Sequence, residues 1–138
     1  MKIDVRYQGK GTFEATSESG ATLSMEGPPD MGGPNASLRP METLLAALAG
    51  CSAVDVVKIL LQQREPLEAL SIHVDGTRAD AIPAVFTDIR LVFEIAGKVA
   101  PNKAQRAVQL SMEKYCSVTK MLEPTVRITH EIVLKPEG

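Results

Sequence analysis

Residues 39–60 read RPMETLLAALAGCSAVDVVKIL, and this stretch decides the fold. Residues 41–63 contain no proline and one glycine, and apolar residues fall on nearly every side of a helix through Val57. This pattern predicts a helix that is buried all round rather than one with a single apolar face. Pro40 suits the first turn of such a helix, and Glu42 can stabilise its N-terminal dipole.

The segments on both sides of this helix predict an α+β protein. Before it, alternating apolar residues indicate a three-stranded antiparallel meander, followed by a loop rich in proline and glycine. After it, two long strands, a second helix beginning at Pro101 and a closing strand are expected. The expected parts of a single domain 1–138 are the meander 1–26, the loop 27–39, the central helix 40–64 and the remainder 70–138.

The central helix also predicts a partner. A helix of 23 residues that is apolar on every side carries more apolar surface than one thin sheet of this chain can cover. A second copy of the chain would cover the rest. We therefore expect an antiparallel sheet with a long buried helix in an intertwined homodimer, because closed two-fold assemblies are the commonest.

Composition excludes several classes of partner. Fifteen basic and seventeen acidic residues give a net charge of -2, with no long run of either sign, so neither nucleic acid nor a membrane surface is an expected partner. The N-terminus lacks the apolar stretch of a signal peptide, and no window reaches the roughly 20 apolar residues that span a bilayer. We therefore expect a cytoplasmic protein.

Cys51 and Cys116 are the only cysteines of the chain. In a reducing compartment they form either a transient redox pair or two small buried hydrophobes. Cys116 directly precedes residues 117–120, which look like the start of a short helix. The free amides there, with Lys114 and Lys120 nearby, would lower the pKa of Cys116. The alternative is that Cys116, at the end of a helix, packs among apolar side chains and has no chemical role.

Asp55 and Lys58 share the helical stripe of Cys51, since they fall about 40° and about 20° from it around the helix. A buried carboxylate without a partner costs several kcal/mol, so Asp55 needs a cation, a hydroxyl or backbone donors. The alternative is an ion pair between Asp55 and Lys58 with no chemical role. His73 and His130 have no cysteine or carboxylate at ligand spacing, so no metal site is expected.

The stretch 39–60, the segment EKYCSVTKMLEP at 113–124 and the closing ITHEI at 128–132 together resemble the OsmC/Ohr family, named for osmotically inducible and organic hydroperoxide resistance proteins. The order of elements matches along nearly the whole chain. The likeness is to a largely uncharacterised branch with S-P-M-E before the helix and C-S-x-x-D-V within it. Arg39 stands here where that serine would be.

This resemblance implies a homodimer with two sites, each using both cysteines of one chain. In the peroxidase members the helix cysteine attacks a hydroperoxide and the later cysteine resolves the sulfenic acid to a disulfide. By resemblance, then, Cys51 attacks and Cys116 resolves. The implied substrate is a small hydrophobic hydroperoxide, the implied reductant is a cellular thiol or dihydrolipoyl group, and no cofactor or metal is implied. An apolar pocket lined by Met41, Leu44, Leu48 and Met121 would suit an alkyl substrate.

The chain departs from the peroxidase pattern in two places. In those members a hairpin arginine activates the thiolate, held by a glutamate about ten residues before the helix cysteine. Here that position is Met41, Glu42 lies about 180° around the helix from Cys51, and the turn at 16–20 has no arginine. Glu42 is then more simply a first-turn acid that stabilises the helix.

Another cation would have to replace the missing arginine. Arg39 is our first choice, with Lys58 and Lys120 as further candidates, although Arg39 can equally be a solvated residue beside the helix. The leading hypothesis is a dithiol redox protein and cysteine-based peroxidase. The alternative is a binding or stress-response protein of the same fold that lacks efficient turnover because the activating arginine is absent, and a weaker third reading is a purely structural dimer.

Overall fold

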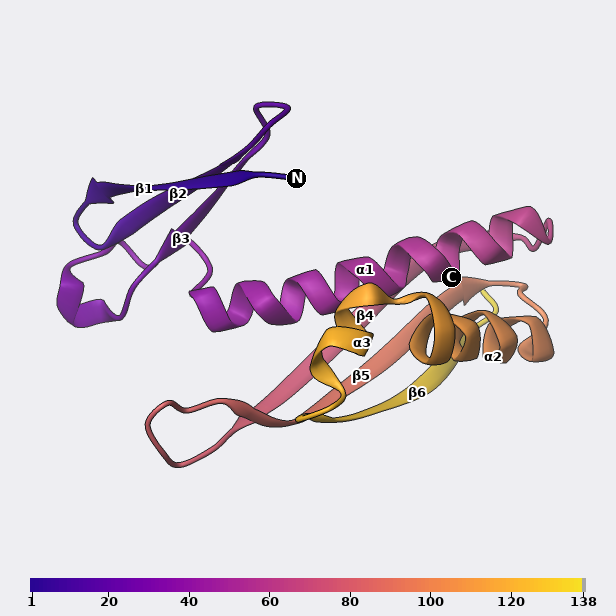
Figure 1. Ribbon diagram of the computed structural model, residues 1–138. Coiled ribbons are helices and arrows are strands. Elements are labelled where there is room, and N and C mark those ends of the chain that lie inside the picture. The colour runs from indigo at the N-terminus through magenta and orange to yellow at the C-terminus, as the bar shows by residue number, and fades with distance from the viewer. Residues whose placement is uncertain (138) are drawn as a thin grey trace. The chain divides into compact units, whose positions relative to one another are not determined.

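The computed structural model describes residues 1–137 and shows two compact units, Met1–Leu44 and Leu45–Gly138. Each unit has its own three-stranded sheet, and helix α1 (Pro40–Gln62) runs from the first unit into the second (Figure 1). The expected α+β class is confirmed, while the division into a single domain stays a prediction.

The first unit is an antiparallel meander. Its strands β1 (Ile3–Gly9), β2 (Thr12–Ser17) and β3 (Thr22–Glu26) pair in the order β1-β2-β3. Val5 lies opposite Ala15, which lies opposite a leucine of β3, so apolar side chains line up across the sheet. The meander that the alternation predicted is therefore present.

A buried carboxylate holds the loop after this meander. Glu26 is 1% exposed, and its side chain accepts hydrogen bonds from the backbone amides of Asn35 (2.8 Å), Ala36 (2.6 Å) and Ser37 (2.5 Å). The hydrogen bond from Ser37 is the largest cause that lowers the pKa of Glu26. These bonds satisfy the backbone of a segment that prolines and glycines keep out of regular structure.

The second unit is built on a mixed sheet of β4 (Leu67–Arg78), β5 (Phe86–Gly97) and β6 (Arg127–Lys135), in that order. β4 and β5 are antiparallel, but β5 and β6 are parallel, which differs from the wholly antiparallel sheet that we expected. The connection between β5 and β6 explains why these two strands are parallel. Two helices separate β5 from β6 and return the chain to the end of the sheet where β5 began.

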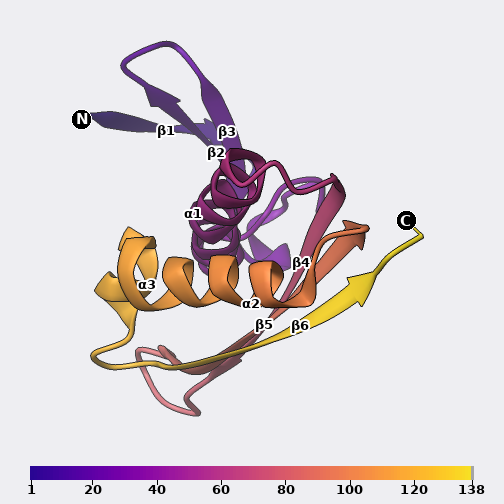
Figure 2. The ribbon, with the colours of Figure 1, turned by 90° about the vertical axis from the view of Figure 1, so that its right-hand side faces the viewer.

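These helices are α2 (Pro101–Leu110) and α3 (Ser117–Leu122), joined by a π-helical turn, η2 (Ser111–Tyr115). They lie with α1 on one side of the sheet (Figures 1 and 2). β5 supplies the centre of this core with alternate residues. The core side chains that are at most 1% exposed are Leu48, Val56, Leu60, Ile89, Leu91, Phe93, Ile95, Ala104, Ala107 and Val108.

Within one chain, α1 is buried along a single stripe. Its fully buried residues are Leu48, Ser52, Val56 and Leu60, spaced by four. On the opposite stripe Val54 is 67% exposed, and Leu61 is exposed as well. The expectation of burial all round is thus wrong for the isolated chain, and the helix ends at Gln62 rather than at residue 64.

Among residues 1–137, α1 is the one helix that is long and apolar enough to cross a membrane by length and composition. This differs from our expectation that no window reaches the roughly 20 apolar residues that span a bilayer. Core helices of soluble proteins pass the same test, and one stripe of α1 is fully buried within the chain.

Candidate functional site

Two free thiols meet in the second unit. Cys51 is half-buried on α1, and Cys116 is fully buried between η2 and α3. Cys51 lies near enough to Cys116 to raise the pKa of the Cys116 thiol. The fold therefore brings together two cysteines that are 65 residues apart in the sequence, while their catalytic roles stay predictions.

Cys116 caps the start of α3. Its Sγ accepts a hydrogen bond from the backbone amide of Thr119 at 3.4 Å, as a helix-capping side chain does. The Thr119 hydroxyl donates to the Sδ of Met112 at 4.0 Å, and Thr119 is only 2% exposed. The predicted short helix after Cys116 is thus present, and Cys116 is its N-cap residue.

Burial raises the pKa of the Cys116 thiol above its ordinary value of 9.0. The two Thr119 donors lower the pKa and the Cys51 thiol raises it further, but burial is the largest cause. The expected net lowering by the free amides and the nearby lysines is therefore wrong, although the Thr119 amide does lower the pKa of Cys116. Lys120 pairs instead with Glu123 at 3.0 Å, and Lys114 lies over the ring of Tyr115.

The carboxylate of Asp55 is held by a hydroxyl. Ser111 Oγ donates to Asp55 Oδ2 at 3.0 Å, and Ser111 Oγ also lies 2.8 Å from Ser52 Oγ. Both serines are fully buried. A hydroxyl was one of the three kinds of partner that we expected for Asp55, and no ion pair between Asp55 and Lys58 occurs in the described part of the chain.

A polar pocket of about 530 Å³ opens beside this network. Asp55 and Lys58 line it from α1, and Tyr115, the residue before Cys116, lines it from η2. Leu48 is fully buried and Met121 is 79% exposed, and the apolar pocket that we expected from these side chains stays a prediction.

Arg39 and Glu42 form the N-terminal cap of α1. The Glu42 side chain accepts a hydrogen bond from the Arg39 backbone amide at 2.8 Å, the reciprocal half of a capping box. This geometry supports Glu42 as a first-turn acid. The charge of Arg39 lowers the pKa of Glu26 within the first unit, and its role as an activating cation stays a prediction.

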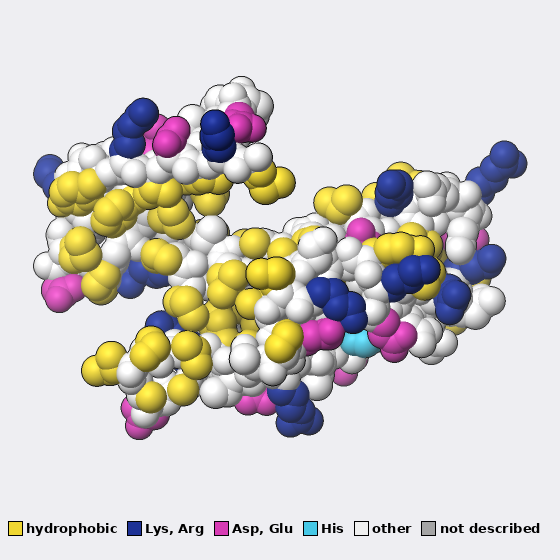
Figure 3. Space-filling view, in the orientation of Figure 1, with side chains coloured by type: hydrophobic (Ala, Val, Ile, Leu, Met, Phe, Trp, Pro, Cys, Tyr) yellow, Lys and Arg dark blue, Asp and Glu magenta, His cyan; other side chains and the backbone are white. Residues whose placement is uncertain are grey.

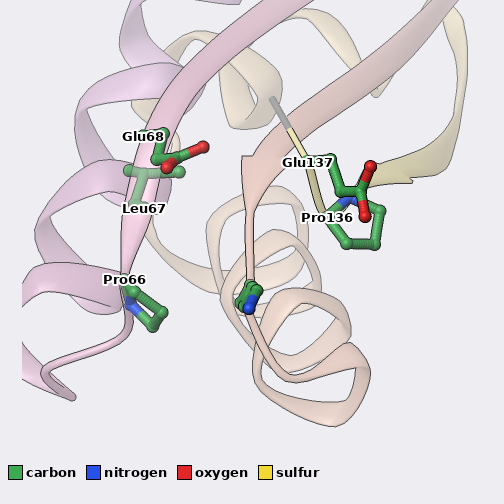
Figure 4. A pocket seen from close by; sticks show the side chains of 6 residues that line it. Pro66, Leu67, Glu68, Pro136 and Glu137 are labelled. Atoms are coloured by element: carbon green, nitrogen blue, oxygen red, sulfur yellow. The ribbon is translucent and has the colours of Figure 1, made fainter.

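A second pocket, of about 550 Å³, has neither cysteine in its lining, and Figure 4 shows the side chains that surround it. Pro66, Leu67 and Glu68 line it from the start of β4, and Pro136 and Glu137 line it from the chain after β6. It contains neither sulfur nor any residue of the serine and aspartate network, so we assign the candidate site to the region around Cys51 and Cys116.

Sequence reasoning missed Ser111 and Thr119 as site residues. A signal for Ser111 was available, because it lies on the apolar stripe of the predicted second helix, where an unpaired hydroxyl would be unfavourable. Asp55 needed such a hydroxyl as a partner. No comparable signal existed for Thr119, since its contact depends on how the chain turns after Cys116.

Comparisons with known proteins agree with this architecture. The family model described as OsmC-like protein matches residues 33–131. Protein YhfA of Escherichia coli strain K12 is 40% identical over 131 residues, which cover 94% of this chain and 95% of that protein. A solved structure from structural genomics is 35% identical with a TM-score of 0.88 and covers 99% of both chains. The organic hydroperoxide resistance protein OhrB of Bacillus subtilis, 19% identical over 96% of both chains with a TM-score of 0.65, shares the fold.

Proposed function

Since this chain belongs to the OsmC-like protein family, we propose that it is a dithiol redox protein that reduces small organic hydroperoxides with Cys51 and Cys116. The observation that carries this proposal is the proximity of two free thiols from distant parts of the sequence. The fold shared with an organic hydroperoxide resistance protein supports the same class of substrate.

Exposure supports Cys51 as the attacking thiol and Cys116 as the resolving thiol. Cys51 is half-buried, whereas Cys116 has no exposed surface. A residue with exposed surface is the better candidate for meeting a hydroperoxide from solution. The Cys51 thiolate attacks the outer peroxide oxygen, the O–O bond breaks, the alkoxide leaves as an alcohol after protonation, and Cys51 becomes a sulfenic acid.

Cys116 then completes the reaction. Its sulfur attacks the sulfur of the sulfenic acid, a disulfide forms, and the thiol proton leaves with the hydroxyl group as water. The raised pKa of Cys116 keeps this thiol protonated until it is needed. An external cellular thiol or dihydrolipoyl reductant restores both thiols, and the chemistry uses no metal or organic cofactor. A reducing compartment, the cytoplasm, is the location that we propose.

A homodimer belongs to this proposal. On α1 the stripe opposite the core carries Val54 at 67% and Leu61 at 57% exposure, and in the first unit Ile3 and Val5 are also more than half exposed. Hydrophobic side chains gather on the surface in Figure 3. Exposed apolar surface of this kind, present on each of the two units, marks interaction sites in soluble proteins, and a second copy of the chain would cover it.

A second candidate function is a binding or stress-response protein without efficient turnover. One observation favours it. Lys120, one of the candidate activating cations, pairs with Glu123 at 3.0 Å rather than with a thiol.

The rate of hydroperoxide consumption decides between the two functions. We expect the reduced protein to consume cumene hydroperoxide, in the presence of a dithiol reductant, faster than an equal concentration of free cysteine. Cys51→Ser should abolish this activity, and an exposed change such as Ser71→Ala should leave it intact. A wild-type rate no greater than that of free cysteine would reject the peroxidase and leave the binding protein.

A further inference from the structure

The turn that precedes Cys116 departs from α-helical geometry. The backbone amide of Cys116 donates to the carbonyl of Ser111 at 2.8 Å, which is the five-residue step of a π-helix. Single π-helical turns inside α-helices are uncommon and concentrate at functional sites. Here the turn determines where the chain leaves α2, and therefore where Cys116 is placed.

The side chain of Ser111 holds this turn against α1. Its hydroxyl lies 3.0 Å from Asp55 Oδ2 and 2.8 Å from Ser52 Oγ. A carboxylate accepts hydrogen bonds and does not donate them. The Ser111 hydroxyl therefore donates to Asp55, and it also lies 3.4 Å from the Ser52 carbonyl. The Ser52 hydroxyl lies within hydrogen-bonding reach of both Ser111 Oγ (2.8 Å) and Met112 Sδ (3.6 Å).

Ser111 thus connects the two helices that carry the thiols. Its carbonyl holds the backbone of Cys116, and its hydroxyl holds α1 at Asp55, one turn after Cys51. The bond to a carboxylate is of the charge-assisted kind, which is stronger than a neutral one. A break here would release the turn that carries Cys116 without changing either cysteine.

We propose that Asp55 and Ser111 are positioning residues for the dithiol, because their hydrogen bond holds the turn that carries Cys116 against the helix that carries Cys51. This inference rests on the proposed redox pair. Neither residue exchanges electrons. They raise the effective concentration of one thiol at the other, and so favour the disulfide in its equilibrium with an external dithiol.

The equilibrium with dithiothreitol tests this role directly. Oxidised dithiothreitol takes two electrons and two protons from Cys51 and Cys116, which form the disulfide while the reagent becomes a dithiol. Wild type and variants are equilibrated in mixtures of reduced and oxidised reagent, quenched with acid and alkylated. The fraction that carries the disulfide, measured by mass spectrometry, gives the equilibrium constant for its formation.

We expect Ser111→Ala and Asp55→Ala each to lower this constant by about three- to tenfold, the range of coupling between groups in direct contact. Asp55→Asn, which keeps a weaker acceptor, should restore part of the loss. The double variant should lose no more than the more affected single variant, because both changes break the same bond. Ser71→Ala and Asp75→Ala, at exposed positions of β4, are the matched controls and should leave the constant unchanged.

A merely structural role predicts a different outcome. It would lower the melting temperature of the reduced and oxidised forms alike and leave the equilibrium constant at the wild-type value, and that result would overturn the inference. The half-buried Asp55 variants provide the test if Ser111→Ala does not fold. No hydroperoxide is used, so a wild type that forms the disulfide but consumes no hydroperoxide rejects the proposed function alone. A wild type that never forms the disulfide rejects both.

Discussion

The backbone amide of Thr119 donates a hydrogen bond of 3.4 Å to the Sγ of Cys116, a sulfur with no exposed surface. The Thr119 hydroxyl also lowers the pKa of Cys116, while the hydrogen bond that it donates goes to Met112 Sδ at 4.0 Å. A thiolate at this position would have no water to solvate it, so these two donors are the groups that stabilise it. Thr119 therefore influences how readily Cys116 gives up its proton when the disulfide forms.

Thr119→Val tests this influence, because valine keeps the shape and the backbone amide but removes the hydroxyl. We expect the pKa of Cys116 to rise further and the closure of the disulfide to slow. The pKa is measured from the ultraviolet absorbance of the thiolate in a Cys51→Ser background. Thr129→Val, at an exposed position of β6, is the control. A pKa that stays constant or falls would show that the hydroxyl does not act on the sulfur.

The raised pKa of Cys116 also predicts how stability depends on pH. The folded chain holds this proton to higher pH than the unfolded chain, whose thiol has the ordinary pKa of 9.0. The resulting stabilisation is fully present below pH 9.0 and is lost as the pH rises from there through the folded pKa. Urea unfolding under reducing conditions should show a free energy that falls across this range.

The variant Cys116→Ala isolates this effect. Its free energy of unfolding should be lower at neutral pH, because a buried side chain has been truncated, but it should decline less steeply above pH 9.0. An equally steep decline in both proteins would mean that other groups cause the alkaline loss of stability.

The lowered pKa of Glu26 predicts that the free energy of unfolding falls as the solution is made acidic. Its lowered pKa means that its contribution is present above the ordinary value of 4.5 and is lost as the pH falls through the folded pKa. Glu26→Gln should therefore be less stable to urea than wild type above pH 4.5, and the difference should shrink on acidification. Glu18→Gln, at an exposed turn position, is the control. A constant difference would contradict the role of the charge.

The exposed stripe of α1 predicts the effect of a charge at Val54. The wild type should scatter light as a particle of about twice the chain mass of 14.8 kDa, as the commonest closed assembly would. Val54→Lys should shift it toward the single-chain mass, because a buried lysine would lack a partner. Val85→Lys, an exposed valine outside α1, should not. A stable monomeric wild type would exclude the dimer.

The fold could be predicted from the sequence because its decisive signals are local. The apolar stretch of α1, the alternation in β5 and the proline at the start of α2 each depend on neighbouring residues. The parallel pairing of β6 was missed because strand direction depends on the path of the helices between β5 and β6. The π-helical turn at Ser111 was missed for a similar reason, since it is held by contacts with α1.

The site was harder to predict than the fold. Both cysteines were identified, but the pKa of Cys116 was expected to shift in the wrong direction, because nearby lysines in the sequence suggested a positive environment. In the structure these lysines contact Tyr115 and Glu123, and burial is the larger effect. The direction of a side chain and its depth in the core are tertiary properties that spacing alone does not give.

The assignment of Cys51 as the attacking thiol is tested most directly by trapping its sulfenic acid. The variants Cys51→Ser and Cys116→Ser are each exposed to one equivalent of an organic hydroperoxide with a sulfenic acid trap, and the modified peptide is identified by mass spectrometry. The account predicts a trapped Cys51 in Cys116→Ser, formed faster than on free cysteine, and no adduct in Cys51→Ser. Adduct on Cys116 alone would reverse the roles, and no adduct above the rate of free cysteine in either variant would contradict the peroxidase.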